Sequence, residues 1–203
     1  YNGSSAAWTA ENLLINSDGR LALNVGGAGE FTLADVNLIA ALGSADGGFQ
    51  SGSFIGLDTT NAGGSFTYGS ILADTHSGEH SMGLIKLGTG TLILGNSNTY
   101  SDGTVVTGGV LSISTNASLG AAGGALTLNG GTAIQVTGTS DQTINRAPTL
   151  LGASTFEIVA ADNTVTLVSD LTPGGTLTKT GAGALLLNGS ITSTSNMILT
   201  GGL

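Results

Sequence analysis

The chain of 203 residues repeats part of itself. When the sequence is shifted by 93 residues, one lysine, several glycines and leucines, and a Thr-Gly-Gly triplet fall on identical residues. The matched pairs are Lys86 with Lys179, Gly88 with Gly181, Gly90 with Gly183, Leu92 with Leu185, Leu94 with Leu187, and 107–109 with 200–202. Such a repeat constrains the fold, because stacked structural units place equivalent residues in equivalent surroundings. The sequence stops inside the second copy, so we expect a fragment of a longer array.

Short apolar segments recur about every ten residues around the matched blocks. Each is rich in leucine or β-branched residues and is bounded by Gly, Asn, Asp or Pro, a pattern typical of β-strands. The segments are 83–86, 91–94, 110–113, 125–128, 133–136, 155–159, 164–168 and 184–187. They follow one another too closely to leave room for crossover helices.

Two all-β architectures accommodate strands at this spacing, a β-sandwich and a β-solenoid. A sandwich gives no reason for the sequence to repeat, whereas a solenoid stacks coils whose inward positions share one environment. We therefore predict a right-handed parallel β-solenoid (β-helix), with the hand taken from the general preference of parallel crossover connections. With roughly 20–25 residues per coil, the offset would span about four coils. Leu92 and Leu185 should then both point into the core.

The composition fits a rod with few charges. Nearly half of the residues are Gly, Ser, Thr or Asn and only 8% are charged, yet the mean hydropathy is +0.32. The chain is therefore not a disordered polar linker. No charged residue occurs over 103–140 or beyond Lys179. Like charges stacked one strand spacing apart, about 4.8 Å, would repel one another.

Charge and residue usage exclude several classes of function. A net charge of −9 argues against nucleic-acid and anionic-lipid partners. The absence of cysteine excludes disulfides, thiolate metal sites and thiol nucleophiles. No apolar run approaches the roughly 20 residues of a membrane-spanning helix, so we expect no direct membrane insertion by this segment. The sequence begins at Tyr1 without a signal segment, so any export signal or anchor should lie outside it.

The N-terminal part is less regular than the rest. Residues 12–15 and 21–25 resemble strands around an Asp18–Gly19 turn. We assign 1–82 to a less regular solenoid or cap region. The coils should occupy 83–203, with repeats at 83–114 and 175–203.

One short helix is expected in this N-terminal region. Thr32 and Asp35 have the spacing of a capping box, and apolar residues with helical periodicity follow them. This pattern predicts a helix near residues 33–42, with Gly43 as its C-cap. The helix would either cap the stack or decorate its side.

The repeated segment resembles a known family. Residues 83–94 read Gly-Leu-Ile-Lys-Leu-Gly-Thr-Gly-Thr-Leu-Ile-Leu and are followed by Asn-Thr-Tyr at 98–100 and Gly-Gly-Val-Leu at 108–111. This resembles the autotransporter-associated β-strand repeat, although Ile85 stands where threonine is usual. The second copy, at 178–187, lacks the Asn-Thr-Tyr segment and has Ser-Thr-Ser-Asn at 193–196. Residues 52–64 also resemble a segment that often precedes the first such repeat.

The resemblance implies a fold and a location. It implies an extracellular, right-handed β-helical passenger of a very long bacterial surface protein, usually tethered by a C-terminal translocation barrel that would lie outside these residues. No catalytic residues belong to the repeat, so the resemblance assigns none to this chain.

The sharpest candidate for chemistry is the segment from His76 to His80. Its His-x-x-Glu-His spacing is that of the inverted zinc-protease motif. That motif works on a helix, where the two histidines lie one turn apart and share a metal. Here Ser77 and Gly78 fill the centre and no apolar helical period surrounds them, although Asp74 could be a third ligand. A polar surface loop is therefore the favoured interpretation.

Weaker patterns also have simpler explanations. Residues 26–30 begin like a calcium-binding coil, but Phe31 stands where the aspartate should be. Glu157 and Asp162 are a loose acidic pair for polysaccharide cleavage, and the cations Arg146 and Lys179 are isolated from each other. The pairs Gly88/Gly90 and Gly181/Gly183 lack the third glycine of a dinucleotide-binding fingerprint and are best explained as structural corners. Four aromatic residues, Tyr1, Trp8, Tyr68 and Tyr100, are too scattered to predict a stacking platform.

The sequence thus predicts a non-enzymatic structural segment of an extracellular bacterial fibre or surface passenger. We expect no catalytic residue, metal site or cofactor. The expected partners are neighbouring repeats of the same chain or homotypic copies, because coil ends near Tyr1 and Leu203 would expose strand edges. A glycan- or cell-binding adhesin is the first alternative, and a polysaccharide-active enzyme is the second.

Overall fold

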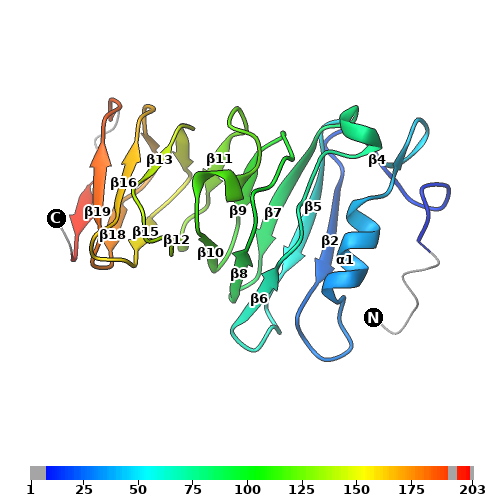
Figure 1. Cartoon of the computed structure of the whole chain (residues 1–203), viewed down its shortest axis with the longest axis horizontal. Helices are drawn as coiled ribbons and strands as arrows, with labels where there is room; N and C mark the ends of the chain where they lie inside the picture. The colour runs from blue at the N-terminus through cyan, green and yellow to red at the C-terminus, as the bar shows by residue number, and fades with distance from the viewer. Residues whose placement is uncertain (1–7, 192–195, 202–203) are drawn as a thin grey trace.

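The computed structural model describes residues 8–191 and 196–201 and is a parallel β-solenoid of about six turns with one short helix (Figure 1). The coils stack along the long axis, with the N-terminal and C-terminal strands at opposite ends. The predicted solenoid is confirmed, and its right-handed winding stays a prediction. Tyr1, residues 193–195 of the second repeat and residues 202–203 lie outside the described residues.

Two seven-stranded parallel sheets run along the rod, and we name them PB1 and PB2. PB1 consists of β2 (Arg20–Asn24), β5 (Ser53–Asp58), β7 (Met82–Leu87), β9 (Thr104–Val106), β11 (Leu126–Leu128), β14 (Pro148–Leu150) and β17 (Thr172–Pro173). PB2 consists of β6 (Ser65–Tyr68), β8 (Thr91–Leu94), β10 (Val110–Ile113), β12 (Thr132–Val136), β15 (Ser154–Ile158), β18 (Leu177–Thr180) and β20 (Met197–Leu199). Neighbouring strands come from successive coils, so the interstrand hydrogen bonds point along the rod.

The third face, PB3, is regular only in the C-terminal coils. There it consists of β13 (Gln142–Ile144), β16 (Thr164–Leu167) and β19 (Ala184–Leu187). The first coils have a separate small sheet of β1 (Leu14–Ile15), β4 (Gly47–Phe49) and the antiparallel β3 (Gly43–Ser44). Between these sheets the face is irregular and includes two 3₁₀ turns, η2 (His76–Gly78) and η3 (Asn116–Leu119).

Inward side chains form apolar columns through the rod. In PB2, Leu92, Leu111, Ile134 and Phe156 are successive in-register partners, and all four are fully buried. Leu185 is partly buried and packs against the same core. Both leucines of the repeat therefore point inward, as predicted. Continuous burial of this kind is the main stabilising term available to a chain with so few charges.

The sequence repeat does not keep to one face of the rod. Lys86 lies in β7 of PB1, whereas Lys179 lies in β18 of PB2. Four coils after β7 the chain reaches β17, so the second copy begins one strand later than four complete coils. The offset thus spans about four coils, as expected, but the extra strand places the second copy of the motif on the neighbouring face. This is possible because on both faces a strand with inward-pointing side chains is followed by a glycine corner.

Helix α1 (Leu33–Ala40) confirms the predicted helix and its capping box. Thr32 Oγ1 accepts a hydrogen bond from the Asp35 amide at 3.3 Å, and Asp35 Oδ2 accepts one from the Thr32 amide at 2.9 Å. In chain order α1 follows β2 and precedes β4, the place that a PB2 strand takes in later coils. It lies at the N-terminal end of the rod (Figure 1).

The predicted C-cap of this helix is wrong. Ala41 is the C-cap, and Gly43 is extended backbone that pairs with Gly48 in the β3–β4 hairpin. A Cβ on Gly43 would lie 2.7 Å from the Thr75 side chain. The glycine is therefore required by close packing and not by a helix end.

The turn at Asp18–Gly19 is present, but it does not join a hairpin. Asp18 has φ 63°, and the Gly19 amide donates to the Asn16 carbonyl at 2.8 Å. The flanking strands pair in parallel with different partners, β1 with β4 and β2 with β5. PB1 runs without interruption from the N-terminal region (1–82) into the following coils, because β7 pairs with β5.

Candidate functional site

The lysine of the first repeat lies inside the rod. Lys86 occupies an inward position of PB1 between Leu57 and Val106 and is fully buried. Its Nζ donates hydrogen bonds to the carbonyls of Leu87, Gly88 and Gly108 at 2.8, 2.7 and 2.9 Å. The aliphatic stem thus replaces an apolar residue of the column, while the ammonium joins the corner to the next coil.

The second repeat builds the same corner on PB2. Lys179 pairs in register with Phe156, is buried, and donates from Nζ to the carbonyls of Gly181 and Gly201. The threonines that follow also match: Thr107 Oγ1 donates to the Lys86 carbonyl and Thr200 Oγ1 to the Lys179 carbonyl, at 2.9 and 3.1 Å. The repeated lysine is therefore a structural cap, which periodicity alone did not indicate.

Burial has electrostatic consequences for these cations. It lowers the pKa of Lys86 to about 8, with the Asp58 carboxylate acting in the opposite direction, and it also lowers the pKa of Lys179. Arg146 is buried too, and its guanidinium donates to the carbonyls of Leu119 (2.9 Å) and Gly120 (3.1 Å). These three cations are already hydrogen-bonded to backbone carbonyls, so they are poor candidates for contacts with a substrate.

The Asn-Thr-Tyr segment of the first repeat is structural for a similar reason. Asn98 Oδ1 accepts from the Leu72 amide at 2.8 Å, and its Nδ2 donates to the Ser118 carbonyl at 2.6 Å. One amide side chain thereby ties together three successive coils on the irregular third face. Tyr100 is fully buried, and its hydroxyl lies 2.6 Å from Thr104 Oγ1.

The segment from His76 to His80 forms a tight loop and not a two-turn helix. His76 and Ser77 have φ of 50° and 57°, and Thr75 and His80 form an antiparallel bridge. His76 Nε2 lies 3.4 Å from Glu79 Oε2, whereas His80 Nδ1 faces the Phe49 carbonyl at 3.2 Å. The two histidines therefore have different polar partners, although their rings pack edge to face with centroids 4.7 Å apart.

Asp74, the possible third ligand, is already engaged. Its Oδ1 accepts from the amides of Met82 (2.8 Å) and Ser101 (2.9 Å), and its Oδ2 accepts from Ser101 Oγ at 2.7 Å. Across residues 8–191 and 196–201, no group of three or more His, Cys, Asp or Glu side chains could hold a metal ion. The arrangement supports the interpretation of a polar surface loop.

The weaker candidates also have structural partners. Glu30 Oε2 accepts from the Gly27 amide at 2.9 Å and its Oε1 accepts from Asn61 Nδ2 at 2.7 Å, so the 26–30 loop is fastened to the next coil. Glu157 accepts from Gln135 at 2.9 Å, one strand away. The repeated Gly88 and Gly181 have φ of 77° and 79° and form corners, as expected.

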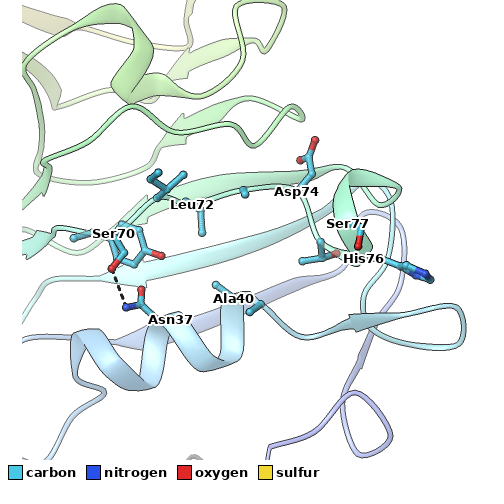
Figure 2. A pocket seen from close by; sticks show the side chains of 12 residues that line it. Asn37, Ala40, Ser70, Leu72, Asp74, His76 and Ser77 are labelled. Carbon is cyan, nitrogen blue, oxygen red and sulfur yellow. Dashed lines mark hydrogen bonds between the residues drawn. The ribbon is translucent and has the colours of Figure 1, made fainter.

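The remaining candidate is a groove between α1 and residues 70–77 (Figure 2). It has a volume of about 260 Å³, and its lining combines amide, hydroxyl and carboxylate groups with small apolar side chains. Asn37 Nδ2 donates to Ser70 Oγ across it at 2.8 Å. Such a lining suits binding better than catalysis, because the Asp74 carboxylate, its natural base, is saturated by three donors.

In the part of the chain that the structure describes, no helix is long and apolar enough to cross a membrane. The rod, its glycine corners and its buried lysine caps define the class: a β-solenoid built from repeated coils, with no catalytic constellation among the described residues.

Comparison with known proteins specifies this class further. Residues 84–113 match the passenger-associated transport repeat. Over 193 residues the chain is 37% identical to the adhesin BmaC autotransporter of Brucella suis biovar 1 (strain 1330), an alignment that covers 91% of this chain and 5% of that protein. No solved structure matches the chain. The chain is therefore a β-solenoid segment of the autotransporter passenger type, which carries the passenger-associated repeat and is homologous to this adhesin.

Proposed function

We propose that this segment is a non-enzymatic spacer of an extracellular bacterial passenger, which holds other parts of a long protein away from the cell surface. The observation that carries the proposal is the pair of seven-stranded sheets whose ladders follow one axis. Each coil adds about 4.8 Å of length, so about six coils supply about 30 Å of stiff rod.

Two further observations support a scaffold role. Lys86, Arg146 and Lys179 donate to backbone carbonyls, and Asn98 and Asp74 also make structural hydrogen bonds. The relative that the chain resembles is described as an adhesin, and this segment corresponds to 5% of it. A spacer that presents an adhesive part elsewhere in the parent protein fits both observations.

The proposal can be tested in the parent protein on cells. Residues 83–191 would be duplicated in one version and replaced by an equally long Gly/Ser linker in another, with an epitope tag placed beyond them. The duplication should raise the tag farther from the membrane, and the flexible linker should lower its mean height and broaden the distribution. Super-resolution or force microscopy measures this height.

A swap separates spacing from direct binding. Replacing the segment with an unrelated solenoid of equal length should preserve adhesion if the segment is a spacer. Loss of adhesion after this swap, at unchanged tag height, would contradict the proposal and favour a binding role for the segment itself.

A further inference from the structure

The wall of the groove that faces α1 has an unpaired backbone edge. Leu72 turns both of its backbone groups to the next coil: its amide donates to Asn98 Oδ1 at 2.8 Å, and its carbonyl accepts from the Thr99 amide at 2.8 Å. Because backbone groups alternate between the two sides of an extended chain, those of Ile71 and Ala73 point to the groove (Figure 2). In the described part of the chain, no hydrogen bond reaches the N–H or C=O group of either residue.

This edge is open to solvent, unlike the floor of the groove. Ile71 is 61% exposed and Ala73 is partly exposed, and across the groove Ala41 is exposed. Asn37 Oδ1 and Tyr68 are buried and belong to the floor, out of reach of a ligand. The groups available to a partner are therefore the free backbone groups of the wall and the side chain of Ile71.

The free edge is short, because the wall contacts the preceding coil at both ends. At one end Asn37 Nδ2 donates to Ser70 Oγ at 2.8 Å. At the other end the packing is so close that a Cβ on Gly43 would lie 2.7 Å from the Thr75 side chain. Residues 71–74 lie between these contacts and span about 13 Å of extended chain. The edge thus has room for a few residues of a partner and not for a long strand.

The arrangement of donors and acceptors identifies the kind of partner. In a parallel ladder, one residue donates its N–H to residue i−1 of the neighbouring strand and accepts from the N–H of residue i+1. A residue placed opposite Leu72 would meet the free carbonyl of Ile71 and the free amide of Ala73 in this way. Strand edges with such unpaired groups are templates for an added strand. An extended peptide is therefore the ligand whose chemistry matches this edge.

Charge determines which peptides suit the groove. Three of the four cations of the chain are buried, so Arg20 is the exposed one, whereas none of the thirteen acidic residues is buried. Asp74 lines the groove, and Glu79 is exposed in the adjoining loop. This negative surface attracts a basic peptide and repels an acidic one. A second copy of this chain is a poor source, because no segment of it has two basic residues close together.

We propose that this groove docks a short basic segment of another protein, which binds in extended conformation as an added strand. A small residue of that segment lies opposite Leu72, donates its N–H to the Ile71 carbonyl and accepts from the Ala73 amide. Lysine or arginine residues on either side of it approach Asp74 and Glu79. The site goes beyond the spacer role and does not depend on it, since tag height on cells and peptide binding to this chain are separate measurements.

The test is an NMR titration of the isotopically labelled chain with two short peptides, acetyl-Lys-Thr-Ala-Thr-Lys-amide and its counterpart with glutamate in place of lysine. The lysine peptide should shift the backbone amide signals of Ile71 and Ala73 and slow hydrogen exchange at the Ala73 amide. The glutamate peptide should bind at least about ten-fold more weakly. If the lysine peptide leaves both signals unchanged, or if the two peptides bind equally well, the proposal is wrong.

Methylated peptides test the strand pairing itself. A methyl group on the nitrogen of the central alanine removes the N–H that pairs with Ile71 and should weaken binding by about ten-fold. A methyl group on the nitrogen of the following threonine is the matched control, because that N–H points away from the wall, and it should weaken binding much less. Equal affinities of the two methylated peptides would exclude an added strand.

Two protein variants locate the site. Ile71→Lys and Leu151→Lys add the same charge at residues that are 61% and 64% exposed, but Leu151 does not line the groove. Ile71→Lys should weaken binding of the lysine peptide by about ten-fold and Leu151→Lys by less than about two-fold, with circular dichroism confirming that both are folded. Equal effects would mean non-specific attraction to an acidic surface. Shifts of the Ala73 signal that follow protein concentration without any peptide would assign the groove to a second copy. Either result would overturn the proposal.

Discussion

At the scale of single residues, buried cations connect the coils of this rod. Lys86 and Lys179 extend along apolar columns and end on glycine carbonyls of their own corner and of the next coil. An ammonium group in the interior is costly unless such acceptors surround it. The repeated lysine is thus matched to the repeated glycines, because the glycine carbonyls are the acceptors that its buried ammonium group needs.

Removal of the ammonium group should destabilise the rod. Lys86→Met keeps most of the aliphatic stem but leaves the carbonyls of Gly88 and Gly108 without this donor. We expect a loss of about 1–3 kcal/mol in the free energy of unfolding, measured by urea denaturation. Arg20→Met, at an exposed position where the guanidinium lies 5.9 Å from the centre of the Phe54 ring, is the control and should change stability by less than about 1 kcal/mol. An unchanged or raised stability of Lys86→Met would show that the cap contributes nothing.

The same lysine should make stability depend on pH. Burial lowers the pKa of Lys86 to about 8, below its unfolded value, so between pH 8 and about 10.4 the unfolded chain binds more protons than the folded chain. The contribution of Lys86 to stability therefore rises with pH over this interval.

A difference measurement isolates this effect. Burial raises the pKa of Tyr68 and Tyr100, which lowers stability above about pH 10, but wild type and Lys86→Met share this contribution. The stability of wild type relative to Lys86→Met should increase between pH 8 and pH 10. A constant difference across this range would contradict the assigned pKa.

Residue-scale features were the hardest to predict from the sequence. Matching Lys86 with Lys179 indicated equivalence, but no periodicity states that a lysine points inward, because its long stem is apolar and its end is charged. Likewise, the unpartnered oxygen of Asn37 depends on how α1 packs against Ser70, a contact between residues far apart in the sequence.

At the scale of elements, local signals predicted the helix and many of the longer strands, but they missed the short PB1 strands β9, β14 and β17. β8 and β10 occupy the predicted residues, and α1 follows its capping box. The irregular third face was not predictable in the same way. On that face the side chains of Asn98 and Arg146 make hydrogen bonds to backbone groups that would be paired between strands in a regular sheet. Such side-chain contacts leave no periodic pattern in the sequence.

Glycine corners allow a sharp test at this scale. Gly88 and Gly131 have nearly the same φ, 77° and 78°, but only Gly88 is crowded: an added Cβ would lie 2.6 Å from the Thr60 amide nitrogen, whereas nothing lies within 4 Å at Gly131. Gly131→Ala should cost about 1–2 kcal/mol from the left-handed backbone alone. Gly88→Ala should cost clearly more, because packing is added to the same strain.

Thermal and chemical denaturation of the two variants checks this ranking. Equal losses would mean that the corner relaxes freely and that close approach between coils is not what requires Gly88.

At the scale of the whole molecule, the sequence repeat and the structural coil have different periods. Self-comparison indicated stacked units correctly, since a solenoid gives equivalent positions equivalent surroundings. It did not indicate that the second copy lies on PB2 instead of PB1, because strand, corner and strand look alike on both faces. The number of residues in each coil varies with its loops, so sequence offset alone does not fix the face.

The central claim is that successive coils stack in register along one axis. Spin labels on outward positions of PB2 test it, using Thr67 with Glu157 and Thr67 with Thr180, pairs that the ladder separates by four and five strand steps. Pulsed electron resonance should give distances near about 19 Å and about 24 Å, differing by one strand spacing. Equal distances, or a shorter one to Thr180, would mean that the chain folds back on itself and that the solenoid is wrong.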